Sequence, residues 1–200
     1  MKYLICALLL TASCVRPTTP SEPGDSVSEE ERWSELKDGL YVDEGGALAF
    51  RIEGLNRNGE PKVYFQTHFG ESPLKEQVDV ESFRRVEDSL FYRDDARIYH
   101  LHEQAGGGKL MPREDLDPES FRLLPGCYAA DRAHVYTERG RALQGADRAT
   151  FFSSDAVSCC MGADADGFFR WADRIDAPDT LAKEELACLA ELKKQRDAGR

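Results

Sequence analysis

Apolar and polar positions alternate with a period of two over much of the chain, which is typical of β-strands. From Leu48 to Ile52 every second residue is apolar, and the stretch 63–69 alternates in the same way. Asn58-Gly59 lies between these two stretches and is turn-prone. The pattern therefore predicts a β-hairpin near the start of the folded part of the chain.

A unit of two halves follows this hairpin and is most complete in residues 116–151. Its first half is residues 117–121, DPESF, in which Asp is a good helix N-cap and Pro fits the first helical position. Its second half is residues 128–136, where two short β-favouring runs flank a turn led by Asp131. We expect one helical turn that places Phe121 in the core, followed by a hairpin.

Copies of both halves occur before and after this unit, in the same order. A Phe ends the first half, an Asp begins each hairpin turn, and the three Phe positions are 38 and then 30 residues apart. Spacings of this size indicate repeated supersecondary units that share one core. The hairpin over 47–69 reads as a degenerate first copy. The equivalent positions are Phe83, Phe121 and Phe151 in the first half, and Asp94, Asp131 and Asp164 in the second.

Residues 131–136, DRAHVY, resemble the Asp-Lys-Asn-x-Val-Tyr core of the DKNYY repeat family. Residues 145–151, GADRATF, are similar to the Gly-Ala-Asp-x-x-Thr-Phe element that precedes this core in the family. The resemblance covers about residues 78–170, although no Lys-Asn pair follows the turn aspartates. It implies a bacterial and often extracytoplasmic protein. The family has no characterised function, so the resemblance implies no catalytic residues.

The C-terminal stretch has the pattern of an amphipathic helix. It starts near Pro178, with Asp176 or Ala177 as the candidate N-cap, and ends near Asp197. Its apolar residues fall near one face, which should pack on the hairpins. These residues are Leu181, Cys188, Leu189 and Leu192.

The predicted fold is α+β and mainly β, with repeated β-hairpins joined by short helical turns and a C-terminal helix packed on them. Residues 103–115 contain three consecutive glycines and are expected to form a mobile loop. The expected organisation is a lipoprotein signal peptide over 1–13, a lipidated Cys and disordered tether over 14–31, and a single repeat domain over 32–198.

The N-terminus has the features of a bacterial secretory signal. One Lys precedes an apolar run that is too short to span a bilayer of ~30 Å. Residues 11–14, TASC, resemble a lipobox, which implies cleavage before Cys14 and attachment of lipid to its sulfur. Val15 stands where an Asp would resemble the inner-membrane retention signal. We therefore expect an outer-membrane lipoprotein that faces the periplasm or the cell surface.

The mature chain is strongly acidic. Of the 26 Lys and Arg, Lys2 is lost with the signal, which leaves 25 against 37 Asp and Glu and a net charge of −12. This charge disfavours nucleic acid and anionic lipid surfaces as partners. The expected partners are the membrane, through the N-terminal lipid, and another protein, for which a basic surface would suit the charge. Solubility alone also accounts for an acidic chain.

Cysteines outside the signal and the lipidation site number four: Cys127, Cys159, Cys160 and Cys188. An even number in an oxidising compartment reads as two disulfides. Neighbouring strand residues point to opposite faces, so Cys159 and Cys160 should have different partners. We expect Cys127–Cys160 and Cys159–Cys188, with Cys127–Cys159 and Cys160–Cys188 as the alternative. A redox pair is disfavoured because CxxC is absent, and a zinc site because the spacings do not match paired ligand motifs.

Motifs for enzyme chemistry are missing from the sequence. It contains no GxSxG, HExxH or papain-like Cys pattern, and Ser120 and Thr150 occupy positions where a helical turn needs a small polar residue. His100 and His102 share one strand face, but no third metal ligand is evident. We therefore expect no catalytic residues, no bound metal and no cofactor.

These features favour a lipid-anchored extracytoplasmic protein with a non-enzymatic binding or envelope-structural role. One alternative is a periplasmic immunity protein that binds and neutralises a toxin through its acidic surface. A second alternative, from a different class, is a metal-dependent hydrolase.

Overall fold

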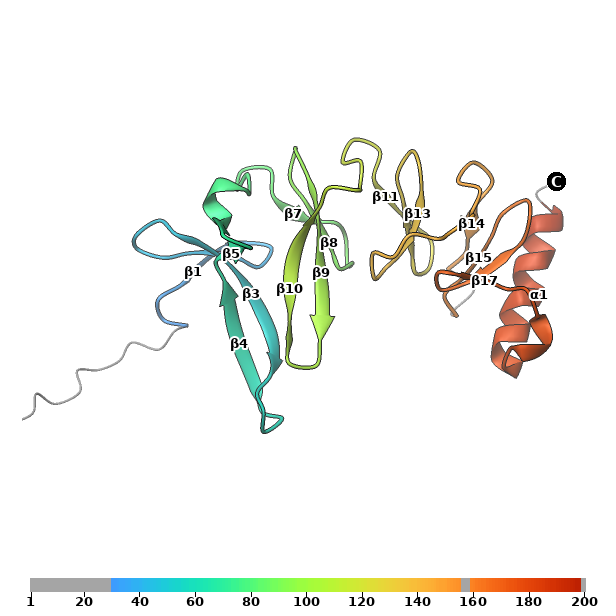
Figure 1. The fold of residues 1–200 in the computed structure, drawn as a ribbon, viewed down its shortest axis with the longest axis horizontal. Coiled ribbons are helices and arrows are strands. Elements are labelled where there is room, and N and C mark those ends of the chain that lie inside the picture. The colour runs from blue at the N-terminus through green and yellow to red at the C-terminus, as the bar shows by residue number, and fades with distance from the viewer. Residues whose placement is uncertain (1–29, 156–158, 199–200) are drawn as a thin grey trace, which may run out of the picture.

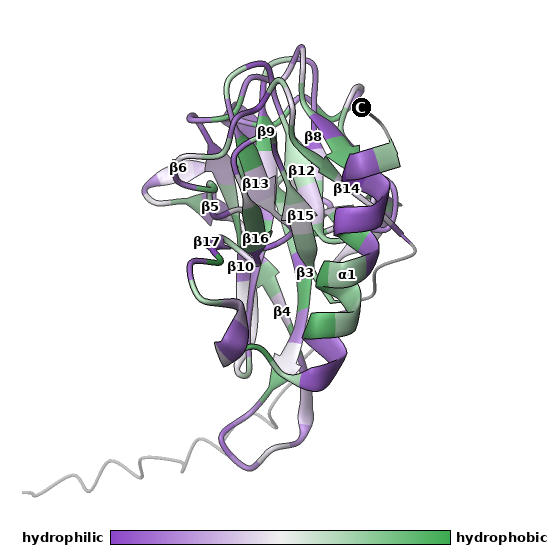
Figure 2. Cartoon of the chain, turned by 90° about the vertical axis from the view of Figure 1, so that its right-hand side faces the viewer, coloured by the Kyte–Doolittle hydropathy of each residue, from purple (hydrophilic) through white to green (hydrophobic). Residues whose placement is uncertain are grey.

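The computed structural model describes residues 30–155 and 159–198. Within these residues the structure is mainly β with a C-terminal helix, which confirms the predicted fold class. Four antiparallel sheets of three or four strands follow one another along the long axis of the described part, and the helix lies at one end (Figure 1). Seen along this axis, the sheets are stacked one behind another (Figure 2).

Each of these sheets, together with the aromatic residue before its first strand, is called a unit here. Unit 1 (33–66) contains β1 (Ser34–Lys37), β2 (Leu40–Val42), β3 (Leu48–Leu55) and β4 (Pro61–Gln66). Unit 2 (83–113) contains β7 (Arg84–Arg85), β8 (Phe91–Arg93), β9 (Ile98–Gln104) and β10 (Gly107–Arg113). Unit 3 (121–143) contains β11 (Arg122–Leu124), β12 (Tyr128–Ala130), β13 (Val135–Thr137) and a bridge between Tyr136 and Ala142. Unit 4 (151–174) contains β14 (Phe152–Ser153), β15 (Met161–Ala163), β16 (Phe168–Arg170) and β17 (Asp173–Arg174).

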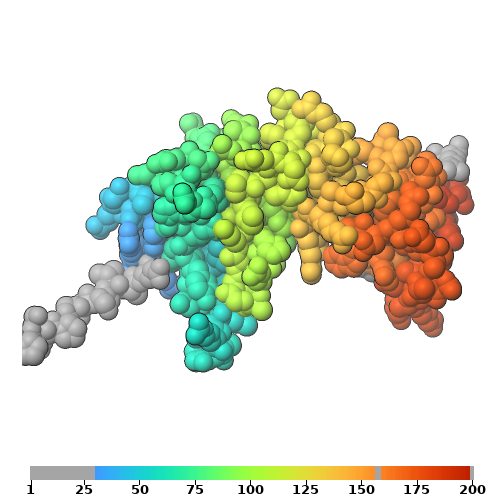
Figure 3. Space-filling model, viewed as in Figure 1, coloured from blue at the N-terminus to red at the C-terminus, as the bar shows by residue number. Residues whose placement is uncertain are grey.

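Short elements connect and follow the units. Between units 1 and 2 lie β5 (His68–Phe69), β6 (Ser72–Pro73) and the 3-10 turn η1 (Leu74–Glu76). After unit 4 come the 3-10 turn η2 (Pro178–Thr180) and the helix α1 (Lys183–Ala198). The units appear as successive bands of the molecular surface, in the order of the chain (Figure 3).

The predicted hairpin turns at Asp94, Asp131 and Asp164 are confirmed. They join β8 to β9, β12 to β13 and β15 to β16, which pair in antiparallel fashion. In each turn the N–H of the Asp donates to the carbonyl three residues later, at 3.0, 3.1 and 3.0 Å. Each turn therefore occupies the same place in its unit, between the second and third strands.

The three Phe residues are buried at equivalent positions, as predicted. Phe83, Phe121 and Phe151 are 0, 6 and 8% exposed. Each ring contacts an aromatic ring of the preceding unit. The pairs are Phe83 with Phe50, Phe121 with Phe91, and Phe151 with Tyr128, with centroid separations of 6.5, 4.9 and 5.2 Å.

The core is divided into layers, one between each pair of neighbouring units and one under α1. Successive residues of a strand point to opposite faces, so one strand supplies two layers. In β8, Tyr92 packs in the layer shared with unit 1, and Phe91 packs in the layer shared with unit 3. Leu189 and Leu192 of α1 pack with Met161 of β15. Each unit is thus stabilised mainly by its neighbours, as in other repeat proteins.

Unit 1 shares the pattern of the later units, with one extra residue in its turn. The N–H of Asp43 donates to the carbonyl of Ala47 at 3.1 Å, and the Asp43 carboxylate accepts the N–H of Ala47 at 2.8 Å. Trp33 stands directly before β1 and is buried, as the Phe residues are in units 2 to 4. The degenerate first copy is therefore a complete unit that starts at Trp33.

The prediction of a mobile loop over 103–115 is wrong. Most of it belongs to the β9–β10 hairpin, which pairs regularly as far as Gly107 and Gln104. A Cβ atom on Gly54 of β3 would lie 2.3 Å from the Cα of Gly107. The glycines therefore allow the backbones of units 1 and 2 to approach closely, which is a packing role and not a flexible one.

The helix α1 begins later than predicted. Lys183 is its first residue, and the Glu185 carboxylate accepts the N–H of Ala182 at 2.9 Å, which caps the first turn. Pro178 belongs to the separate turn η2, and Leu181 after it is extended and buried beside the core of unit 4. The backbone at Leu181 leaves the helical conformation to bury this side chain, so a helix cannot run on from Pro178.

Candidate functional site

The polar residues that recur in units 2 to 4 form one arrangement, which we call the Asp turn. In unit 3 one oxygen of the Asp131 carboxylate accepts the N–H groups of Ala133 and His134 at 2.8 and 2.7 Å. The other oxygen accepts the N–H of Asp117 at 3.2 Å and the hydroxyl of Tyr136 at 2.9 Å. One side chain thus ties the hairpin turn to the turn that precedes the sheet.

The Asp turn of unit 2 has the same bonds. Asp94 accepts the N–H groups of Ala96, Arg97 and Asp79 at 2.8, 2.7 and 3.1 Å and the hydroxyl of Tyr99 at 2.6 Å. Both carboxylates are almost fully buried, and their oxygens are occupied by groups of the same unit or its leading turn. Their role in the structure is therefore to hold the fold together.

Unit 4 keeps the Asp turn with one replacement. Asp164 accepts the N–H groups of Asp166, Gly167 and Asp147 at 2.9, 2.7 and 2.8 Å. Phe169 stands where units 2 and 3 have Tyr, so no hydroxyl is available. The guanidinium of Arg174 lies 3.7 Å from the Asp164 carboxylate and 5.3 Å from the Phe169 ring centroid. A cation thereby compensates for the missing hydroxyl.

Small hydroxyl residues close the turn before the sheets of units 2 to 4. Thr150 donates to the Asp147 carboxylate at 2.7 Å and accepts the N–H of Ala165 at 3.0 Å. Ser120 donates to Asp117 and accepts the N–H of Arg132 at 2.8 Å. Each of these hydroxyls donates one hydrogen bond and accepts another within the fold, so its role is to form the turn.

Acid should weaken the fold through Asp131. Burial acts to raise the pKa of this carboxyl, but the four hydrogen bonds that it accepts outweigh burial and hold the pKa below its usual value of 3.8. A carboxyl with a lowered pKa stabilises the fold fully above 3.8, and this stability is lost as the pH falls through the pKa of the folded state. We expect urea unfolding to show constant stability near neutral pH and a decline below about pH 4. The Asp131→Asn variant should lose less stability below about pH 4 than the wild type. An equal loss in both proteins would assign the effect to other carboxyls.

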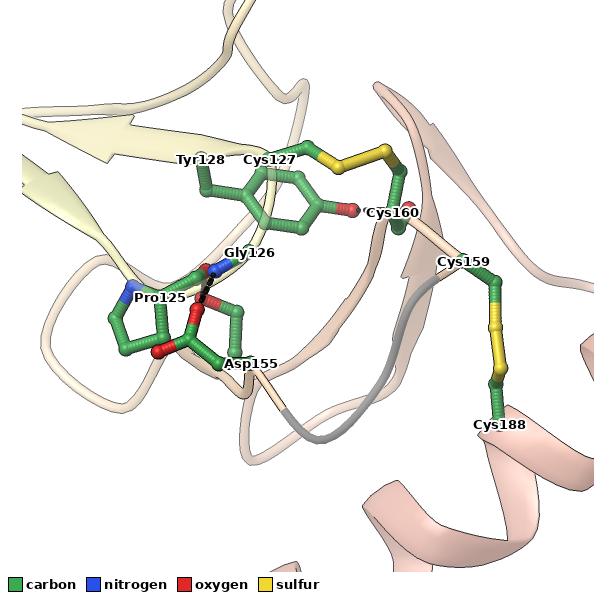
Figure 4. Close-up of a disulfide and its surroundings, with 9 residues drawn as sticks. Pro125, Gly126, Cys127, Tyr128, Asp155, Cys159, Cys160 and Cys188 are labelled. Atoms are coloured by element: carbon green, nitrogen blue, oxygen red, sulfur yellow. Dashed lines mark hydrogen bonds between the residues drawn. A yellow bond between two sulfur atoms is a disulfide. The ribbon is translucent and has the colours of Figure 1, made fainter. Parts of the chain in front are cut away.

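Two disulfides are present in the described residues, and they have the pairing favoured from the sequence (Figure 4). Cys127 is bonded to Cys160 and Cys159 to Cys188, with Cα separations of 5.2 and 6.6 Å. The hydroxyl of Tyr128 also donates to the carbonyl of Cys160 at 2.8 Å. Unit 3 is therefore joined covalently to unit 4, and unit 4 to α1.

Removal of the Cys127–Cys160 disulfide is expected to lower the free energy of unfolding by ~3–4 kcal/mol. The bond closes a loop with a sequence separation of 33, and its loss restores the entropy of that loop in the unfolded chain. The measurement is urea unfolding of the variant with both Cys127→Ser and Cys160→Ser. Thiol titration of the denatured, non-reduced wild-type chain should detect no free thiol from the four cysteines of the two disulfides. Reactive thiols at these cysteines would contradict the pairing.

The two histidines of β9 have different surroundings. His100 is 4% exposed, its Nε2–H donates to the carbonyl of Glu138 at 3.0 Å, and its ring packs on Phe91. Burial lowers the pKa of His100, so the ring is neutral at pH 7 and connects unit 2 to unit 3. His102 is exposed on the same strand. The structure thus gives His100 a packing role between units.

A group of potential metal ligands lies beside the first disulfide. Cys127, Glu138 and Cys160 offer atoms within 4.8 Å of one another. Both sulfurs are joined in the disulfide, so neither is a thiolate, which is the form that binds a metal. In the oxidised protein this group is a carboxylate beside a disulfide.

A cavity of about 410 Å³ lies between unit 2 and unit 3. Its lining includes the apolar residues Leu90, Leu123 and Pro125. Carboxylates line it as well, and we call this surface the acidic groove. They belong to Glu87, Asp88, Glu138 and Asp155.

The acids of the groove come from the turns of several units. Glu87 and Asp88 lie between β7 and β8, Glu138 follows β13, and Asp155 follows β14. Asp155 accepts the N–H of Gly126 at 2.7 Å (Figure 4), whereas the other three form no ion pair with the described residues. The arrangement suits a ligand that presents cationic groups next to an apolar one.

One position in each unit varies while its backbone is held constant. In units 2 to 4 the residue seven positions after the Asp of the turn donates its N–H to the carbonyl of the residue four positions before that Asp. We call this the variable position. The bonds are Leu101 to Leu90, Glu138 to Cys127 and Trp171 to Cys160, at 2.8, 2.7 and 2.9 Å. The repeat therefore presents chemically different side chains at equivalent points.

Sequence reasoning did not identify the acidic groove, because its acids are scattered among 37 and lie in turns of different units. Alignment of the units on their Asp turns would have singled out Glu138 as a variable position. Cys14, the predicted lipidation site, lies outside the described residues. In the part of the chain that the structure describes, no helix is long and apolar enough to cross a membrane. No protein-family model, characterised protein or solved structure matches this chain.

Proposed function

We propose that the chain is a lipid-anchored extracytoplasmic binding protein without enzymatic activity, built from divergent repeats of the DKNYY type. The observation that carries this proposal is that each unit has constant residues that stabilise the fold and one position whose side chain varies. The recurring aspartates and hydroxyls are occupied inside the fold, whereas the variable position differs from Leu101 to Glu138 to Trp171. A constant scaffold in which the side chain at one equivalent position varies is typical of repeat proteins that bind partners.

In this proposal the lipid that anchors the protein is attached to Cys14. Cys14→Ser is expected to abolish lipidation, because the thiol carries the lipid, and to move the protein from the membrane fraction to the soluble or the unprocessed form. The measurement is fractionation of the envelope together with processing in the presence of globomycin. Membrane association that is unchanged in the variant would contradict the proposal of a lipid anchor.

The partner that suits the acidic groove is another protein with a basic segment. The proposal is tested by capture from envelope extract with the full mature chain, followed by the same capture with the groove neutralised. The groove variant carries Glu87→Gln, Asp88→Asn and Glu138→Gln. A control variant with the same change in charge carries Glu35→Gln, Glu71→Gln and Asp176→Asn, all at exposed positions.

Capture of the same protein by wild type and control, with loss in the groove variant, would support the proposal. Retention by the wild type and by both variants would contradict a role for the groove. Binding should also weaken as ionic strength rises, because exposed charges are screened.

A toxin-neutralising immunity protein is the second candidate, and the acidic groove is the observation that favours it. In that case the captured protein is itself toxic, and co-expression of the wild-type chain should restore growth. The groove variant should fail to do so while its control succeeds.

A further inference from the structure

A second cavity, of about 250 Å³, lies between unit 3 and unit 4. We call it the Arg–Trp pocket. Its wall on unit 3 is formed by the β13 end and the turn after it, and its wall on unit 4 by the β16–β17 connection. The lining residues are Thr137, Arg139, Arg141, Trp171 and Ala172.

Trp171 is in a conformation that the repeat does not require. It is the first residue of the two-residue connection between β16 and β17, and its φ is +55°. Glycine is the usual residue with this φ in a two-residue hairpin, and other residues adopt it at a cost. The equivalent residues of units 2 and 3, Leu101 and Glu138, have no such φ. Trp171 is also 40% exposed, so burial in the core does not account for its presence.

The two arginines of the pocket are available to an anion. Arg139 lies 5.5 Å from the Trp171 ring centroid and forms no ion pair with the described residues. A guanidinium placed over an aromatic ring can still use its N–H donors for another group. Arg141 pairs with Asp173 at 3.1 Å, but both side chains are more than 60% exposed. Such a pair is weak and readily exchanged for another anion.

The walls of the pocket are fixed relative to each other. The carbonyl of Cys160 accepts both the N–H of Trp171 and the hydroxyl of Tyr128, at 2.9 and 2.8 Å. Cys160 is also bonded to Cys127, so Trp171 is held directly against unit 3. A site that is already in place loses little entropy when a ligand binds.

We propose that the Arg–Trp pocket binds a small organic anion, whose carboxylate or phosphate lies between Arg139 and Arg141 and whose body packs on Trp171. Guanidinium groups bind both oxyanions through two parallel hydrogen bonds. The cavity is smaller than the ~300–1,000 Å³ of sites for drug-sized ligands, which favours a ligand the size of one sugar residue over a peptide segment. This site is separate from the acidic groove and goes beyond the proposed protein-binding function.

The test uses the full chain labelled with ¹⁵N, because its two tryptophans give two indole N–H signals. Trp33 is buried in unit 1 and serves as an internal control for Trp171. The probes are glucuronate, glucose 6-phosphate, inorganic phosphate and, as the neutral control, glucose. We expect saturable shifts of the Trp171 signal with glucuronate or glucose 6-phosphate, no shift with glucose, and an unchanged Trp33 signal.

The arginine and tryptophan contributions are separated by variants. Arg139→Gln should weaken binding at least about tenfold, whereas Arg57→Gln, an equal change of charge at an exposed turn of unit 1, should leave it unchanged. Trp171→Gly places the residue preferred at this φ and should keep the fold, as judged by the backbone amide signals of units 3 and 4, yet weaken binding in calorimetry.

Three outcomes would count against this assignment. Equal binding of inorganic phosphate and glucose 6-phosphate would overturn the contact with an organic body and leave a free-anion site. The absence of saturable shifts with every charged probe, or equal affinity of Arg139→Gln and wild type, would overturn the proposal altogether.

Discussion

Replacing Asp131 with alanine is expected to lower the free energy of unfolding by about 4–6 kcal/mol. The carboxylate is 2% exposed and accepts four hydrogen bonds, from three backbone N–H groups and from Tyr136. Its removal leaves the Asp117 N–H without this acceptor, at ~1–3 kcal/mol, and leaves the Tyr136 hydroxyl only its longer contacts with the Asp115 carbonyl at 3.3 Å and His134 at 3.4 Å. The two charged hydrogen bonds within the hairpin turn are lost as well. The measurement is urea unfolding at pH 7.

Asp95→Ala is the matched control for this variant. Asp95 also lies in an Asp turn, but its side chain is exposed, so the change should stay within about ±0.5 kcal/mol. A loss below about 1 kcal/mol for Asp131→Ala would contradict the role of the Asp turn. Hydrogen exchange should further place the damage in unit 3 and its neighbours, because each unit is stabilised mainly by adjacent units.

Truncation of Phe83 to alanine should cost ~3–5 kcal/mol. The ring is fully buried between units 1 and 2, where it lies 5.7 Å from both Tyr92 and Tyr99. Its loss removes apolar contacts and leaves a cavity that the surrounding sheets cannot fill. Chemical denaturation of the variant and the wild type measures the difference.

The equivalent truncations should follow the burial of the rings. Phe83, Phe121 and Phe151 are 0, 6 and 8% exposed, so we expect the largest loss at Phe83 and the smallest at Phe151. Leu36→Ala serves as the control, since Leu36 is 44% exposed. A loss at Leu36 equal to that at Phe83 would show that the Phe positions are not the centres of the core layers.

Local patterns were enough to place the hairpin turns and the buried Phe residues. An Asp turn depends on bonds between Asp131 and residues two and three positions later, so its signal is contained in a few neighbouring residues. The disulfide pairing could also be predicted. Cys127 and Cys160 each stand four residues before a turn aspartate, and stacking of equivalent units brings equivalent positions together.

Local reasoning failed where the role of a residue is set by a distant part of the chain. The glycines near 107 read as a flexible loop because the sequence does not show that Gly54 of unit 1 packs on their backbone. The predicted start of α1 is wrong because burial of Leu181 in unit 4, and not the preference of Pro178 for the first helical position, decides where the helix begins.

The sequence by itself determined the repeat, its Asp turns and its core Phe positions, and it favoured the disulfide pairing that the structure has, since each of these follows from short-range geometry repeated along the chain. Only the tertiary structure decided the candidate surfaces. Glu87 meets Glu138 in the acidic groove, and Arg139 meets Trp171 in the Arg–Trp pocket, because the stacking of units brings together turns that are far apart in sequence. The distance and direction between such turns depend on how the core layers pack, and no pattern within a single unit contains that information.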